Sequence, residues 1–333
     1  MATALTYVFF IIGLVLIIKG GDIFVDSATK VANMLGVPKF IIGATIVSIA
    51  TTLPEIIVSI QATLSKNVDM AVGNAIGSVT ANTALILGLF ITFMPFEIKR
   101  KDISFKGIAM IFAVIFIIIG CIVTQKKELS FKGEVGEYYF LSALGVTLLF
   151  TVFAIFIFEN IKCIKNETKN DESKISYCTK EKVSCIILFI LGAVGIVFGA
   201  RFLVKYATQI AISLNISQRV ISVIAVAIGT SLPELVTALT ALKKKSGSLS
   251  AGNILGANII DLTLILPICS LISITKGSGE LAVSLSCVNF DCIMCLGVIL
   301  IAVLPTIISQ KFKRWQGILL LIIYGIYIYF VVR

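Results

Sequence analysis

Long apolar runs separated by short polar stretches make up the chain, and this pattern predicts ten membrane-spanning helices. Alternating short strands of the kind that build a membrane barrel are not seen, and a helix satisfies its own backbone hydrogen bonds in lipid. The expected spans cover residues 3–34, 38–64, 70–94, 104–124, 137–158, 183–214, 217–242, 247–273, 286–305 and 313–332. The first run lacks a basic region and a small-residue cleavage site, so we interpret it as a span and not as a signal peptide.

Two of the apolar runs are unusually long, and one polar stretch divides the chain. The first and sixth runs have more than thirty residues, which exceeds a hydrocarbon core of about 30 Å, so we expect both helices to be strongly tilted or to extend past the membrane. Residues 159–182 form a polar stretch that predicts a soluble linker. It separates a first half, residues 1–158, from a second half, residues 183–333.

Composition and charge agree with this interpretation. Of 333 residues, 58% are hydrophobic and 14% charged, and the mean hydropathy is +1.06, far from a soluble domain. Basic residues gather in alternate loops: Lys39; Lys99, Arg100, Lys101 and Lys106; the lysines of 162–182; Lys243–Lys245; and Lys311, Lys313 and Arg314. The positive-inside rule then predicts a cell-membrane protein with both termini outside and the linker 159–182 cytoplasmic, although Lys126, Lys127 and Lys132 run against it. Because the charges are scattered over loops, they argue against nucleic-acid binding.

The cysteines do not indicate a cofactor. Most of the eight lie in or beside apolar runs and the others at the linker, so we expect reduced thiols. Cys292 and Cys295 form an isolated CxxC in a chain without histidine, which argues against zinc. We therefore expect no cofactor, and nothing points to an obligate protein partner.

An internal repeat provides the functional signal. TTLPE at 51–55 recurs as TSLPE at 230–234, and an offset of 179 also aligns GNAIGSVTAN at 73–82 with GNILGANIID at 252–261. Each half holds five expected spans, an odd number, so the second half enters the membrane the other way up. Inverted repeats of this kind are typical of secondary transporters, whose site lies near the midplane.

The repeated residues suit a hard cation. A Glu inside a span is costly unless it is functional. Pro54 removes a backbone N–H and releases carbonyl oxygens near residues 50–51, while Thr51 and Glu55 share one helix face. The second copy repeats this with Thr230, Pro233 and Glu234. Two carboxylates with several neutral oxygens suit Ca2+ or Na+.

The second pair of motifs adds polar side chains to the predicted site. Its GxxxG spacing favours close helix packing. Ser78 and Asn82 lie four residues apart on one face, and Asp261 replaces Asn82 in the second copy. We expect Asp261, a third carboxylate within the apolar bundle, to face the site.

Taken together, the pairs GATIVSIATTLPE with GNAIGSVTAN and VIAVAIGTSLPE with GNILGANIID resemble the two alpha-repeats of the calcium/cation antiporter superfamily, specifically its prokaryotic sodium/calcium exchangers. The resemblance covers nearly the whole chain. It implies ten helices in two inverted halves, exchange of Na+ for Ca2+, and alternating access in which the first and sixth helices slide against the remaining bundle.

The same resemblance implies a ligand set. Glu55 and Glu234 would share Ca2+ with the carbonyls of Thr51 and Thr230, and Asn82 and Asp261 would line the central position. A Na+ site near Glu55 would use Ser78, the Ala227 carbonyl, Thr230 and Ser231. Its mirror near Glu234 would use the Ser48 carbonyl, Thr51 and Thr52. The chain departs from the family pattern at Thr52 in place of Ser, Val79 in place of Asn, and Ala257, which lacks the usual hydroxyl.

Charge favours an electrogenic exchanger. Three ionised carboxylates are too many for an apolar site, and Ca2+ balances two, so we expect Asp261 to be neutral. Exchange of more than two Na+ for one Ca2+ would then move charge. Proton or potassium coupling remains an open alternative, because potassium-dependent relatives also carry Asp at this position. A passive channel is a further alternative, and its flux would be insensitive to a counter-ion gradient. An intramembrane protease would need a histidine or a pair of membrane aspartates, which this chain lacks, so we do not expect an enzyme.

Overall fold

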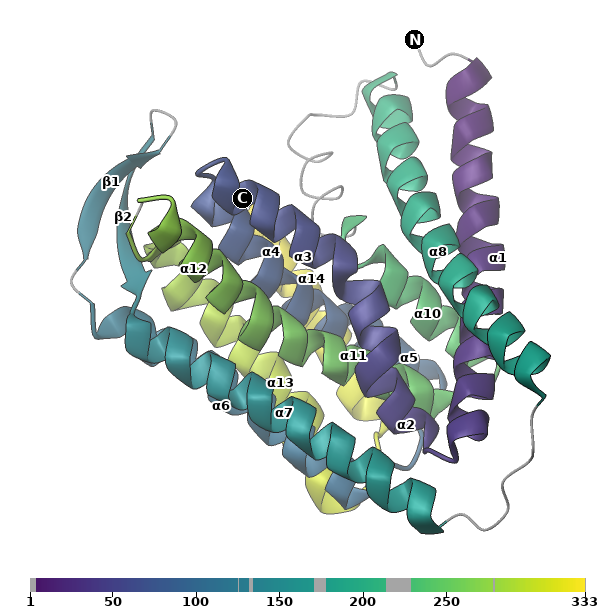
Figure 1. Cartoon of the computed structure of the whole chain (residues 1–333). Coiled ribbons are helices and arrows are strands. Elements are labelled where there is room, and N and C mark those ends of the chain that lie inside the picture. The colour runs from purple at the N-terminus through teal and green to yellow at the C-terminus, as the bar shows by residue number, and fades with distance from the viewer. Residues whose placement is uncertain are drawn as a thin grey trace. The chain divides into compact units, whose positions relative to one another are not determined.

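Helices make up almost the whole protein (Figure 1). The computed structural model describes residues 4–124, 126–131, 134–170, 178–213, 229–277 and 279–332. Within these ranges nine helices are long and apolar enough to cross a membrane. The expected span 217–242 falls partly on residues 214–228, outside the described ranges, and its described part contains α10 (Leu232–Lys243). The fold is the expected all-α membrane fold of two inverted repeats, with nine of the ten expected spans found among the described residues.

The described spans follow the hydrophobic runs closely, and several combine an α-helix with a wider π-helical segment. In the first half the helices are α1 (Ala4–Leu35), α2 (Lys39–Ile42), η1 (Gly43–Val47), α3 (Ser48–Leu64), α4 (Val68–Thr80), η2 (Ala81–Leu87), α5 (Gly88–Phe93), α6 (Arg100–Ile122) and α7 (Ala143–Asn170). In the second half they are α8 (Thr179–Ser213), α10, α11 (Gly247–Ile260), η3 (Asp261–Ile265), α12 (Leu266–Thr275), η4 (Cys287–Asp291), α13 (Cys292–Ser309) and α14 (Arg314–Val332).

A small antiparallel sheet is the part of the fold that the hydrophobic pattern did not predict. Its strands are β1 (Lys127–Phe131), β2 (Glu134–Leu141) and β3 (Leu281–Ser284), in the order β1-β2-β3. The expected start of the fifth span at residue 137 is therefore wrong, and α7 begins at Ala143. The N–H of Gly145 donates to the Ser142 hydroxyl oxygen over 3.2 Å, so Ser142 caps the first turn of α7.

The region expected to be a linker is partly helical. α7 continues to Asn170, beyond the expected end of the fifth span at residue 158, and α8 begins at Thr179. Residues 171–177, which belong to the same stretch, lie outside the described ranges. The described chain forms two compact units, each of which draws on both sequence halves: Met1–Thr51, Asn160–Ile254 and Gly325–Arg333 in the first, and Thr52–Glu159 and Leu255–Tyr324 in the second. The division of the sequence at the linker stays a prediction about the repeat.

Glycines bring α1 and α8 into close contact in the first unit, where the two long helices run side by side (Figure 1). A Cβ atom on Gly13 would lie 2.9 Å from the Leu203 nitrogen, and one on Gly192 would lie 2.7 Å from the Phe24 nitrogen. Gly192 is the repeat equivalent of Gly13. Since a side chain at either position would collide with the opposite backbone, these small residues allow the helices to pack closely.

An ion cluster joins α1 to the end of α10 in the same unit. The Lys244 ammonium lies 2.6 Å from an Asp26 carboxylate oxygen and 3.6 Å from one of Asp22, and it donates to the Asp22 carbonyl over 2.8 Å. The two aspartates are four residues apart and therefore lie on one face of α1. This acidic pair is therefore held in an ion-paired arrangement at the surface.

The second unit places α4 at the centre of several contacts. α4 packs against η3, α13 and β3, and α6 packs along α13, where Gly107 lies beside Val303. The Tyr138 hydroxyl donates to an Asp69 carboxylate oxygen over 2.9 Å, which joins β2 to the start of α4. These contacts hold α4, which leads into η2 and Asn82, and η3, which begins at Asp261.

Candidate cation-binding site

Three carboxylates in the helices of the repeated motifs are almost completely buried. Glu55 and Glu234 are each 1% exposed, and Asp261 is 0% exposed. Burial of an ionised carboxylate costs several kcal/mol unless cations or donors compensate it. Burial at three positions that the sequence repeat had singled out therefore supports a functional role for these residues.

The segment that carries Glu55 is a proline-containing helix. Pro54 lies inside α3, where it cannot donate the usual hydrogen bond to the carbonyl of Ala50. Thr52 is fully buried, and its hydroxyl has no hydrogen-bond partner in the part of the chain that the structure describes. The segment thus presents oxygen atoms beside a buried carboxylate.

An asparagine anchors this segment to α4 in the second unit. Nδ2 of Asn74 donates to the Glu55 carbonyl over 3.2 Å and to the Ser59 hydroxyl over 2.9 Å. The Ser59 hydroxyl in turn donates to the Ala71 carbonyl over 3.3 Å. Because these bonds reach both the backbone of Glu55 and the side chain of Ser59, Asn74 positions α3 against α4.

Asn82 and Asp261 occupy π-helical segments at equivalent places in the repeat. Asn82 lies in η2, and Asp261 is the first residue of η3. Both are buried, and the 179-residue offset relates one to the other. A π-helical turn inside an α-helix frequently marks a functional site. α4, which carries Ser78 and leads into η2, is in contact with η3, so the fold brings these polar segments together within the second unit.

Asn258 joins η2 to the helix that precedes η3. Its Nδ2 donates to the Thr83 hydroxyl over 2.8 Å. Its Oδ1 atom and the Oδ1 atom of Asn82 are buried and lack hydrogen-bond partners among the described residues. Amide oxygens are good ligands for hard cations, so both atoms are chemically suited to the proposed cargo.

The first unit holds the motif around Glu234. Ser231 directly precedes α10, whose first turn contains Pro233 and Glu234. The Ser231 hydroxyl is buried and has no hydrogen-bond partner within the described ranges. The Thr51 hydroxyl donates to Oδ1 of Asn253 over 3.1 Å. This motif differs from the first copy, because Ala238 replaces Ser59 and offers Asn253 no hydroxyl.

The structure places all but one of the residues expected from the sequence. The second unit holds Thr52, Glu55, Ser78, Asn82 and Asp261, and the first holds Ser48, Thr51, Thr230, Ser231 and Glu234. All are buried except Thr230, which is partly exposed. Ala227 lies outside the described residues. Ala257, the equivalent of Ser78, is fully buried in α11.

Three asparagines were not assigned a role from the sequence. Asn74, Asn253 and Asn258 all lie in the repeated motifs, and Asn74 and Asn253 are equivalent under the 179-residue offset. The Asn that follows a Gly in both copies of the motif could have identified Asn74 and Asn253 as candidates from the sequence. Their hydrogen-bond partners, however, lie on other helices, so the roles become visible only in the folded chain.

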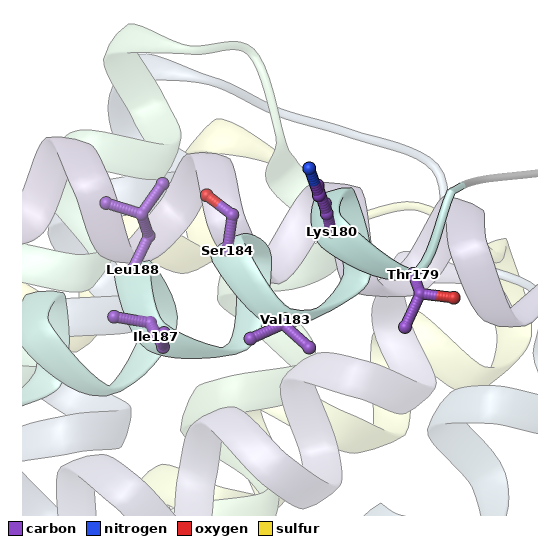
Figure 2. Close-up of a pocket in the computed structure, with 6 residues that line it drawn as sticks. All are labelled: Thr179, Lys180, Val183, Ser184, Ile187 and Leu188. Carbon is purple, nitrogen blue, oxygen red and sulfur yellow. The ribbon is translucent and has the colours of Figure 1, made fainter.

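A surface hollow on α8 is unsuited to cations (Figure 2). It has a volume of about 420 Å3, and Figure 2 shows that all six labelled side chains come from this one helix. Lys180 contributes an ammonium group, while Val183, Ile187 and Leu188 are apolar. Without a carboxylate among its lining residues, this hollow is no candidate for the cation site.

Comparisons with known proteins place the chain in a family. The profile of the family described as sodium/calcium exchanger protein matches residues 5–159 and 184–333. An uncharacterized membrane protein of Methanocaldococcus jannaschii is 31% identical over 95% of this chain and 94% of its own length. The sodium/calcium exchanger MaX1 of Methanosarcina acetivorans is 29% identical over 96% of each chain.

A solved structure has the same fold over nearly the full length. It is the sodium-calcium exchanger NCX_Mj soaked with 2.5 mM Na+ and 1 mM Sr2+, with a TM-score of 0.79, 31% sequence identity and 97% of each chain covered. The matches extend across both repeats and all three buried carboxylates. The chain therefore belongs to the sodium/calcium exchanger protein family.

Proposed function

We propose that the protein is a secondary active antiporter that exchanges Na+ for Ca2+ across the cell membrane by alternating access. The observation that carries this proposal is the burial of three carboxylates, together with buried hydroxyl and amide oxygens of Thr52, Asn82 and Ser231, in a chain from this family. Oxygen ligands of this kind suit Ca2+ and Na+ and do not favour soft metals. The names of MaX1 and NCX_Mj, which are sodium/calcium exchangers, agree with the proposal.

We assign the transported ions to the residues of the repeated motifs. Glu55 and Glu234 are the carboxylate ligands of Ca2+, with the carbonyls of Thr51 and Thr230. The Na+ ligands comprise Ser78, Ala227, Thr230 and Ser231 near Glu55, and Ser48, Thr51 and Thr52 near Glu234. Asn82 and Asp261 line the central position. The buried oxygens of Thr52, Asn82 and Ser231, which lack hydrogen-bond partners among the described residues, support this assignment.

Charge balance assigns different states to the carboxylates. One Ca2+ neutralises Glu55 and Glu234, so we infer that Asp261 is a neutral acid throughout the cycle. More than two Na+ would leave the same site positive. Exchange of those Na+ for one Ca2+ is then electrogenic.

The membrane orientation is also part of the proposal. The basic loops place both termini outside and the region 159–182 in the cytoplasm. Exposed Lys99, Arg100 and Lys101 at the start of α6, and Lys313 and Arg314 at the start of α14, then lie on the cytoplasmic side.

Reconstitution tests both the exchange and the coupling ion. The purified chain is placed in vesicles, and uptake of radioactive Ca2+ is measured with an outward gradient of Na+, of K+ or of protons. We expect uptake with the Na+ gradient alone and faster uptake when a potential compensates the charge. Equal uptake with no gradient would indicate a channel. Uptake that requires K+ or a pH gradient would replace Na+ coupling with one of the alternatives.

A further inference from the structure

The segments before α6 and α14 lie side by side in the second unit. The N–H of Ile98 donates to the Gln310 carbonyl, and that of Phe312 to the Phe96 carbonyl, each over 3.0 Å. The rings of Phe96 and Phe312 are 5.0 Å apart. These contacts hold the first turns of the two helices next to each other.

Basic side chains are concentrated on this pair of segments, which we call the basic platform. Its exposed cationic residues are Lys99, Arg100, Lys101, Lys311, Lys313 and Arg314. The acidic residues of the same segments are Glu97, which lies 3.8 Å from Lys311, and the partly exposed Asp102. Trp315 is half-exposed beside them, as is typical of a residue at a membrane–water interface. The platform therefore has a surplus of positive charge at the end of two spanning helices.

A polar hollow of about 420 Å3 opens on the platform. It is lined by Glu97, Ile98, Lys99, Ser309, Gln310 and Lys311. Ammonium, hydroxyl and amide groups are donors that suit a phosphate group. The hollow is large enough for more than a single phosphate.

An apolar groove begins further along α6. It has a volume of about 330 Å3 and lies between α6 and α7, lined by Phe105, Ile108, Ala109, Phe112, Phe116, Leu148, Thr151, Val152 and Ile155. From Phe105 to Phe116 the helix rises about 16 Å, roughly half of a hydrocarbon core of about 30 Å. The groove thus has the length of one leaflet.

The spacing along α6 connects the platform to the groove. Phe105 lies about 7 Å beyond Arg100 along the helix axis, which is about the depth of the headgroup region on one side of a bilayer. Lys101 is four residues before Phe105 and shares its helix face. When the platform is at the headgroup level, the groove lies in the hydrocarbon of the same leaflet.

We propose that the basic platform and the groove form one binding site for an anionic phospholipid. The phosphate lies in the polar hollow and one acyl chain lies in the groove. Basic clusters at the end of a spanning helix attract anionic lipids. Spanning helices that dock onto each other favour small residues, which let their backbones approach, whereas this groove is lined mainly by Phe, Ile, Leu and Val. A flexible acyl chain fits such a surface better than a second copy of the chain.

The headgroup half of the site is tested by lipid binding to the purified full chain. Native mass spectrometry measures its affinity for phosphatidylglycerol and for phosphatidylcholine with the same acyl chains. In the Lys99→Gln/Arg100→Gln variant we expect affinity for phosphatidylglycerol to fall by about fivefold per charge removed, with little change for phosphatidylcholine. The control Lys126→Gln/Lys127→Gln removes two exposed charges on and beside β1 and should leave both affinities unchanged. Equal losses in the two variants would overturn the site.

The groove half is tested with a matched pair of threonines. Thr151 and Thr147 are both exposed on α7, and each hydroxyl donates to the carbonyl four residues earlier over 2.8 Å, but only Thr151 lines the groove. Thr151→Phe should weaken binding of both lipids, and Thr147→Phe should not. Displacement of the lipid by glycerol phosphate at millimolar concentration would indicate a site for a free anion and overturn the proposal. A change of oligomeric state in Thr151→Phe alone would assign the groove to a second copy instead.

Discussion

The two repeat-equivalent asparagines should differ sharply in their contribution to stability. Asn74→Ala removes two hydrogen bonds donated by Nδ2, one to the Glu55 carbonyl and one to the Ser59 hydroxyl. At about 1 kcal/mol each, the free energy of unfolding should fall by about 2 kcal/mol. Asn253→Ala removes one bond, accepted from Thr51, and also a buried Nδ2 group that has no partner among the described residues. Removal of such a donor relieves about 1–3 kcal/mol, so the net loss should be near zero.

Thermal unfolding in detergent without Na+ or Ca2+ measures this difference. Both substitutions delete the same side chain at a buried position, so the void they leave is comparable and the contrast reports the hydrogen bonds. Ser59→Ala removes two bonds, one accepted from Asn74 and one donated to the Ala71 carbonyl, so its Tm should fall about as far as that of Asn74→Ala. Equal falls for Asn74→Ala and Asn253→Ala would refute the reasoning, as would a Ser59→Ala protein as stable as the unsubstituted chain.

Three further predictions concern transport in reconstituted vesicles. Glu55→Gln and Glu234→Gln should each abolish Ca2+ flux while the protein stays folded, because no neutral oxygen replaces the lost charge; near-normal exchange in either variant would end the calcium-ligand assignment. Asp261→Asn should keep Ca2+ exchange and flatten its pH dependence if Asp261 is a neutral acid, and a dead variant would show that the anion is required. Ala257→Ser should lower the Na+ concentration for half-maximal exchange by up to about tenfold, because one neutral ligand contributes roughly 0.5–1.5 kcal/mol. Ser78→Ala should raise that concentration. An unchanged Na+ curve for Ala257→Ser would place position 257 away from the site.

Periodic hydrophobicity and the repeat determined most of the fold at the level of sequence. A spanning helix satisfies its backbone within its own segment, so the nine described spans could be located from local composition. The repeated Glu55 and Glu234 were visible as site candidates because a carboxylate is conspicuous in an apolar run. Strand β2 was missed because its aromatic and apolar residues continue the hydrophobic run of α7, and only pairing with β1 and β3 distinguishes it.

Tertiary structure decided the features that depend on partners distant in the sequence. The roles of Asn74 and Asn253 follow from Ser59 and Thr51, which lie on α3 and not on their own helices. Lys244 bonds to α1 across more than two hundred residues, and the basic platform exists because the segments around Ile98 and Gln310 pair through their backbones. Hydropathy and repeat spacing report what each segment can bury, whereas the choice between equally suitable polar partners depends on distances that only the folded chain sets.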